Sequence, residues 1–260
     1  MFRARAAMSE VAKIRRSSRA TFEKGAAARV QTVVFVHAFG SSGRAWGPQV
    51  AGLGDRYRVV APDLPGHGGA AGPFTLERAV ESVRAVIADA GGRAHLVGIS
   101  GGATVALLTY LENPGRVASL VLSAGVAHAP RLVSLQRAIQ RALPESVLAR
   151  LLRGWYSGGR REYEQVAAED FRRCGKRTFL TALRELAHVD LRGRLGEVAV
   201  PALVACGARD RANLGPSREI AAGVPSAELR IIPDGVHLWN LQQPELFNET
   251  VAEFLARSLD

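Results

Sequence analysis

Ser100 has the sequence context of a residue able to do chemistry. An apolar run at residues 94–98 leads into it, and a helical pattern at 102–115 follows it. A sharp turn from strand to helix strains the backbone of its central residue and crowds the neighbours, so glycines are needed two positions before and two after. Gly98 and Gly102 meet that need. The segment is therefore predicted to present the Ser100 hydroxyl as a nucleophile.

A serine hydroxyl needs a base, normally a histidine that a carboxylate orients. Among the six histidines, His237 is favoured because its loop follows the last predicted strand, at 227–235, and can reach over the sheet. Asp210, in the loop after the preceding strand, is the expected carboxylate. Asp234 is the rival, but three residues before His237 it is expected to cap a turn. The chain order Ser100, Asp210, His237 is typical of one such fold.

Alternating apolar and amphipathic segments must position these residues. Strands are predicted at 30–37, 56–63, 94–98, 117–125, 201–207 and 227–235, and helices at 47–55, 75–92, 102–115 and 244–259. Thr75 is the expected N-cap of the second helix. Strands that are apolar on both faces and separated by helices predict an α/β fold with a mostly parallel sheet covered on both sides. Ligands bind at the carboxyl ends of the strands in such a sheet.

The alternation stops between residues 126 and 191, where only helical patterns occur, at 130–143, 145–156, 160–173 and 176–188. The predicted organisation is an N-terminal tail with edge strands (1–29), a core in two pieces (30–125 and 192–260), and an inserted helical lid (126–191).

Composition narrows the classes of partner. The 260 residues are 47% hydrophobic and 22% charged, and no apolar run is long enough to span a bilayer. The net charge of +10 comes almost entirely from arginines spread along the chain, with no nucleic-acid-binding motif. Cys174 and Cys206 lie far apart, without the spacing of metal ligands. No nucleic acid, membrane or metal is expected, and a reducing cytoplasm is the expected location.

Five stretches together resemble the α/β-hydrolase superfamily: HAFGSSGRAW, DLPGHGG, GISGG, GARD and GVHLWNLQQPELF. The resemblance extends from about residue 30 to 258 and implies a serine hydrolase with a helical lid and no cofactor. It also implies an oxyanion hole formed by the backbone N–H groups of Phe39 and Gly101, with His37 bracing the first of these loops. Ala38 departs from the family, which usually has glycine there, and is acceptable only with a negative φ.

The activity implied is acyl transfer from an ester, thioester or lactone of a small molecule, by a monomer or homodimer. His37, Ala38, Ile99, Trp155 and Trp239 are candidates to line the site. Lid arginines could meet an anionic substrate, although a solvated face is the expected role for any one of them.

Two alternatives stay open. GSSGRAW and DLPGHG also resemble a lyase of menaquinone synthesis, which would need arginines clustered around a dicarboxylate, and the superfamily includes C–C hydrolases as well. A ligand receptor built on the same fold would show very slow hydrolysis.

Overall fold

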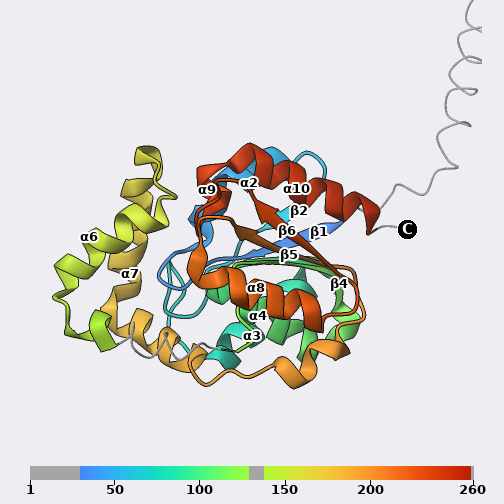
Figure 1. Ribbon diagram of the computed structural model, residues 1–260, viewed down its shortest axis with the longest axis horizontal. Helices are drawn as coiled ribbons and strands as arrows, with labels where there is room; N and C mark the ends of the chain where they lie inside the picture. The colour runs from blue at the N-terminus through green and yellow to red at the C-terminus, as the bar shows by residue number, and fades with distance from the viewer. Residues whose placement is uncertain (1–29, 129–137, 259–260) are drawn as a thin grey trace, which may run out of the picture. The chain divides into compact units, whose positions relative to one another are not determined.

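The structure is a computed structural model that describes residues 30–128 and 138–258 (Figure 1). The predicted N-terminal tail and edge strands, at 1–29, lie outside the described residues. So do residues 129–137 of the predicted helical insertion.

Within the described residues, one sheet has the strand order β2-β1-β3-β4-β5-β6, and every neighbouring pair is parallel. The strands are β1 (Thr32–Val36), β2 (Arg58–Val60), β3 (Ala94–Ile99), β4 (Val117–Ser123), β5 (Ala202–Gly207) and β6 (Ala227–Ile232). Every residue of β1, β3 and β5 is buried, as expected for strands covered on both faces. The predicted parallel sheet is confirmed.

Helices cover both faces of the sheet. Figure 1 shows α3 (Leu76–Asp89), α4 (Gly101–Glu112) and α8 (Arg211–Gly223) on one face, with α2 (Gly47–Leu53) and α10 (Pro244–Arg257) on the other. The shorter helices are α9 (Trp239–Gln242) and the 3-10 turns η1 (Gly43–Trp46), η2 (Pro114–Arg116) and η3 (Arg192–Glu197).

Two of these helices bear on the sequence predictions. Thr75 caps α3 as predicted, because its hydroxyl accepts a hydrogen bond of 3.1 Å from the Arg78 N–H. Helix α8 was not predicted. Pro216 lies inside it, directly after Gly215, and the pair weakens its helical pattern.

Aromatic packing fixes η1 and α10 to the sheet. The fully buried Trp46 ring lies 4.8 Å from Phe35 of β1 and 5.6 Å from Phe247 of α10. Trp239 packs 4.5 Å from the same Phe247 ring. These large apolar side chains bury much of the area that stabilises this layer of the core.

Between β4 and β5 the chain forms α6 (Glu145–Tyr156) and α7 (Arg161–Leu186), which pack on each other to the left of the sheet in Figure 1. Gly175 interrupts α7 with φ 71° and ψ 154°, so its two halves match the separate helices predicted at 160–173 and 176–188. No helix in the described ranges is long and apolar enough to cross a membrane.

Candidate active site

Three parallel strands end at the same edge of the sheet and place the candidate catalytic residues there. Ser100 directly follows β3, Asp210 follows β5 by three residues, and His237 follows β6 by five. All three positions are at the carboxyl ends, where open parallel sheets bind ligands.

Ser100 occupies a strained turn at the start of α4. Its φ of 57° and ψ of −126° are rare for a residue with a side chain and cost about 1–3 kcal/mol. The Ser100 N–H donates to the Ser123 carbonyl at 2.8 Å, which anchors the turn to β4. A Cβ on Gly102 would lie 2.2 Å from the Val36 carbonyl oxygen, and one on Gly98 would lie 2.4 Å from the Gly102 oxygen. Only glycine fits at both positions.

His237 pairs with Asp210. The imidazole Nδ1 lies 2.7 Å from Asp210 Oδ2, and both side chains are buried. The Asp210 carboxylate makes Nδ1 the protonated nitrogen, which leaves the Nε2 lone pair free to accept a proton.

Two glycines bring the loops of this pair together. The Arg209 N–H donates to the Gly235 carbonyl at 2.9 Å. A Cβ on Gly207 would lie only 2.2 Å from the same oxygen, so a larger residue would push the loops apart. Asp234, the rival carboxylate, is exposed and has a φ of 54°, as a turn residue does.

Asn213 is a further residue of the site, and it was not predicted from the sequence. Its Nδ2 lies 2.9 Å from each carboxylate oxygen of Asp210 and 3.2 Å from His237 Nδ1. Because Nδ1 carries a proton toward Asp210, the amide acts as a donor to the carboxylate. The available signal was the three-residue spacing from Asp210 to Asn213, which places the two on one side of a helix's first turn. This spacing is informative only if a helix begins at residue 211, and α8 was not predicted.

Ser100 and His237 line one cavity of about 120 Å³. Its other lining residues are Phe39, Gly101, Ala124, Val126, Trp155, Tyr156, Phe179, Leu183, Leu186, Ala212 and Asn213. Most of these described lining residues are apolar, and none of them is an arginine, a lysine or a carboxylate. Within the described residues the Ser100 hydroxyl makes no hydrogen bond, so its link to His237 belongs to the proposal below.

A tight turn after β1 carries the first candidate oxyanion donor. The Ser41 N–H donates to the Ala38 carbonyl at 3.1 Å, and Gly40 has a φ of 84°. Ala38 is not among the residues with positive φ, so its departure from glycine causes no strain. The Phe39 side chain is also buried, and its ring packs 4.9 Å from Phe74.

The buried His37 side chain stabilises this turn through hydrogen bonds. The Leu64 N–H donates to His37 Nε2 at 2.9 Å, so Nδ1 carries the proton and donates to the Ala38 carbonyl at 2.8 Å. Burial lowers the pKa of His37, which keeps the ring neutral for this arrangement. The C=O and N–H of a trans peptide point in opposite directions. Holding the Ala38 oxygen therefore fixes the direction of the Phe39 N–H.

The second candidate donor is the N–H of Gly101, the first residue of α4, whose amide has no partner within the helix. A Cβ on Gly101 would lie 2.5 Å from Cδ2 of the Phe39 ring. The residues carrying the two candidate donors are therefore in close contact, beside Ser100.

Only one of the five candidate lining residues lines the cavity. Trp155 does, and its ring stacks on His237 at 4.7 Å and 24°. His37, Ala38, Ile99 and Trp239 are not among its described lining residues. The first three are buried, at the end of β1 and in β3, and the Trp239 indole N–H donates to Ser123 Oγ at 2.8 Å.

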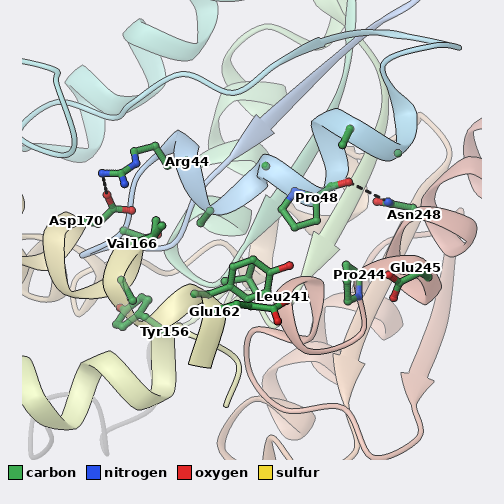
Figure 2. Close-up of a pocket in the computed structure, with 17 residues that line it drawn as sticks. Arg44, Pro48, Tyr156, Glu162, Val166, Asp170, Leu241, Pro244, Glu245 and Asn248 are labelled. Atoms are coloured by element: carbon green, nitrogen blue, oxygen red, sulfur yellow. Dashed lines mark hydrogen bonds and ion pairs between the residues drawn. The ribbon is translucent and has the colours of Figure 1, made fainter. Parts of the chain in front are cut away.

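A larger groove of about 740 Å³ lies between η1, α2, α7 and α10, and Figure 2 shows it. Arg44 and Asp170 form an ion pair of 3.5 Å at one end, and Pro48 accepts a hydrogen bond of 3.1 Å from Asn248 at the other. Neither Ser100 nor His237 lines this groove. Tyr156 lines both the groove and the Ser100 cavity.

Among the described residues, no group of three or more histidine, cysteine or acidic side chains is arranged to hold a metal ion. None of the arginines of α6 and α7 is among the described residues that line the Ser100 cavity. Arg153, for example, pairs with Glu164 at 3.5 Å on the surface.

Comparison with known proteins identifies the family. A pimeloyl-acyl-carrier-protein methyl ester esterase of Methylococcus capsulatus is 33% identical over 249 residues, covering 87% of this chain and 95% of the relative. The 3-oxoadipate enol-lactonase 1 of Acinetobacter baylyi is 27% identical, over 86% of this chain and 88% of the relative. A crystal structure of a hydrolase from Pseudomonas aeruginosa has a TM-score of 0.77 and 25% identity, covering 89% of this chain and 92% of its own. The sequence pattern of the alpha/beta hydrolase family matches residues 33–250, and the chain belongs to that family.

Proposed function

We propose that this enzyme hydrolyses an ester, thioester or lactone of a small molecule through an acyl-enzyme on Ser100. His237 Nε2 removes the hydroxyl proton as Ser100 Oγ attacks the carbonyl carbon, and Asp210 stabilises the imidazolium that forms. The Phe39 and Gly101 N–H groups receive the developing oxyanion. The imidazolium then protonates the departing alkoxide or thiolate, and water, activated by the same histidine, releases the acid.

The observation that carries this proposal is the His237–Asp210 pair, 2.7 Å apart, whose imidazole lines the same small cavity as a strained Ser100. The related esterase and enol-lactonase act on the same class of carbonyl compound.

The cavity supports a short, uncharged acyl group as the preferred substrate. Its volume of about 120 Å³ is below the range of about 300–1,000 Å³ of typical ligand pockets. Most of its described lining side chains are apolar, and burying a charged group against them without a partner is costly. The lyase alternative requires arginines around a dicarboxylate, and the described lining residues include none. This observation favours hydrolysis.

The substrate is the only partner in this proposal, and the chain acts as a monomer or homodimer that binds neither nucleic acid nor membranes. Cytoplasmic location is supported by the two cysteines, which are unpaired and buried. Surface ion pairs engage part of the basic charge. Arg194 with Glu197 and Arg257 with Glu228 are examples, each at 2.9 Å.

Kinetics with p-nitrophenyl esters of increasing acyl length test the proposal. We expect hydrolysis that is fastest for acetate to butyrate and falls by about a million-fold in Ser100→Ala. Ser226→Ala is the matched control, because its hydroxyl donates to the Val200 carbonyl and Ser226 is not among the residues that line the cavity. An enzyme inert to every ester would contradict the proposal in favour of the lyase. Slow turnover that Ser100→Ala leaves unchanged would contradict it in favour of a receptor.

A further inference from the structure

Tyr156, the last residue of α6, joins the inserted helices to the turn that carries Phe39. Its hydroxyl donates to the Phe39 carbonyl, and only 7% of the residue is exposed. Burial raises the pKa of Tyr156, so the hydroxyl keeps its proton and remains a donor.

The Phe39 carbonyl belongs to the central peptide of a tight turn. Ser41 N–H donates to the Ala38 carbonyl across the turn, Gly40 has a φ of 84°, and Phe39 is not among the residues with positive φ. These features define a type II turn. Its central peptide, Phe39–Gly40, can flip toward the type I form by rotation at ψ of Phe39 and φ of Gly40. The Tyr156 hydroxyl holds this peptide by its oxygen.

We propose that Tyr156 is a positioning residue for the oxyanion hole, an inference that rests on the proposed function. Phe39 lies between two peptides. His37 holds the first through the Ala38 oxygen, and Tyr156 holds the second through the Phe39 oxygen. With both peptides fixed, the Phe39 N–H keeps one direction before the substrate arrives. Such preorganised donors stabilise charge that appears only in the transition state.

Helix α7 contacts the same turn. A Cβ on Gly40 would lie 3.0 Å from the Phe179 ring and 3.4 Å from the Tyr156 hydroxyl, so the turn packs closely against the insertion. The Ser42 hydroxyl donates to Asp170 Oδ2 at 2.7 Å, and Asp170 is fully buried. Side chains from α6 and α7 therefore add contacts to the turn after β1, beyond those that the core itself makes with this turn.

The test compares Tyr156→Phe with Tyr110→Phe. Tyr110 is also a buried tyrosine, on α4, and its hydroxyl donates to the Glu197 carbonyl at 3.3 Å and accepts from the Ala199 N–H at 2.9 Å. For a short p-nitrophenyl ester, we expect kcat of Tyr156→Phe to fall by about 10- to 100-fold, less than the loss of an oxyanion donor itself, with KM within about twofold. Tyr110→Phe keeps the wild-type kcat, even where its melting temperature falls equally.

Inhibition by a trifluoromethyl ketone separates positioning from a structural role, because this compound adds to the serine and forms an oxyanion. Its affinity for Tyr156→Phe falls by the same factor as kcat, while a phosphonate probe still labels Ser100. Wild-type kcat and wild-type inhibitor affinity in Tyr156→Phe, in an enzyme that loses activity in Ser100→Ala, overturn this inference alone. A wild-type enzyme without esterase activity overturns the proposed function and this inference with it.

Discussion

At the scale of single residues, the candidate site depends on where the Asp210 carboxylate makes its hydrogen bonds. Asp210 stands at the N-terminus of α8 yet makes no capping hydrogen bond with its side chain. The carboxylate instead faces His237 at 2.7 Å and receives the Asn213 amide. Its first task, in the proposed mechanism, is to hold the imidazole in the tautomer that leaves Nε2 free.

Asp210→Asn tests that task. The amide keeps the size of the side chain but can donate to His237 Nδ1, which favours the wrong tautomer. We expect kcat to fall by about ten-thousand-fold, as for the same change in other triads. Asn213→Ala removes one donor to the carboxylate and leaves the tautomer intact, so its loss is far smaller. Steady-state kinetics of both variants check this order, and equal losses would contradict the assigned roles.

At the scale of elements, a glycine within a helix can either interrupt the helix or continue it. Gly175 divides α7 with a φ of 71°, although a Cβ there would meet nothing within 4 Å. Gly154 lies inside α6 and also has open space around it, with no positive φ. The two positions differ in backbone conformation and not in available room.

Alanine substitutions at these glycines should therefore have opposite effects. Gly175→Ala places a side chain in a backbone conformation that is essentially restricted to glycine, and it lowers the free energy of unfolding by about 1–3 kcal/mol. Gly154→Ala replaces a helix-interior glycine and raises it by about 0.5–1 kcal/mol. Urea unfolding of the two variants measures both changes. A stabilising Gly175→Ala would mean that α7 runs through residue 175 without a break.

At the scale of the whole molecule, the sequence predicts the parallel sheet and the family because buried strands and tight turns leave short, local patterns of apolar residues and glycines. The helix cap at Thr75 is likewise a local feature that the sequence predicts, and the family match confirms the overall assignment. Tyr156 could not be found this way. Its contact joins residues 117 positions apart, and within α6 it is simply one more residue of the buried stripe. The positions of Trp239 and Ile99 likewise depended on packing that no local pattern encodes.

Buried histidines make the molecule sensitive to acid. Burial lowers the pKa of His67 from 6.5 to about 3 and of His95 to about 4, and it also lowers that of His37. The unfolded chain therefore binds protons first as the pH falls. The contribution of these neutral rings to the free energy of unfolding is complete above about pH 7 and is lost progressively from pH 6.5 toward pH 4 and 3.

Urea unfolding at pH 7, 6, 5 and 4 should show this decline, with the steepest change below pH 6.5. His95→Gln removes one of the three titrating groups, so its stability should vary less with pH even where its value at pH 7 is lower. Stability that stays constant down to pH 4 would mean that these rings are protonated or exposed in the folded protein.

The most direct measurement of the central claim is covalent labelling with a fluorophosphonate probe, followed by peptide mapping. We expect one adduct, on the peptide that contains Ser100, in the wild type and in Ser226→Ala. Labelling should be slowed strongly in His237→Ala and absent from Ser100→Ala. An adduct on any other residue, or none on a chain that hydrolyses esters, would contradict the account.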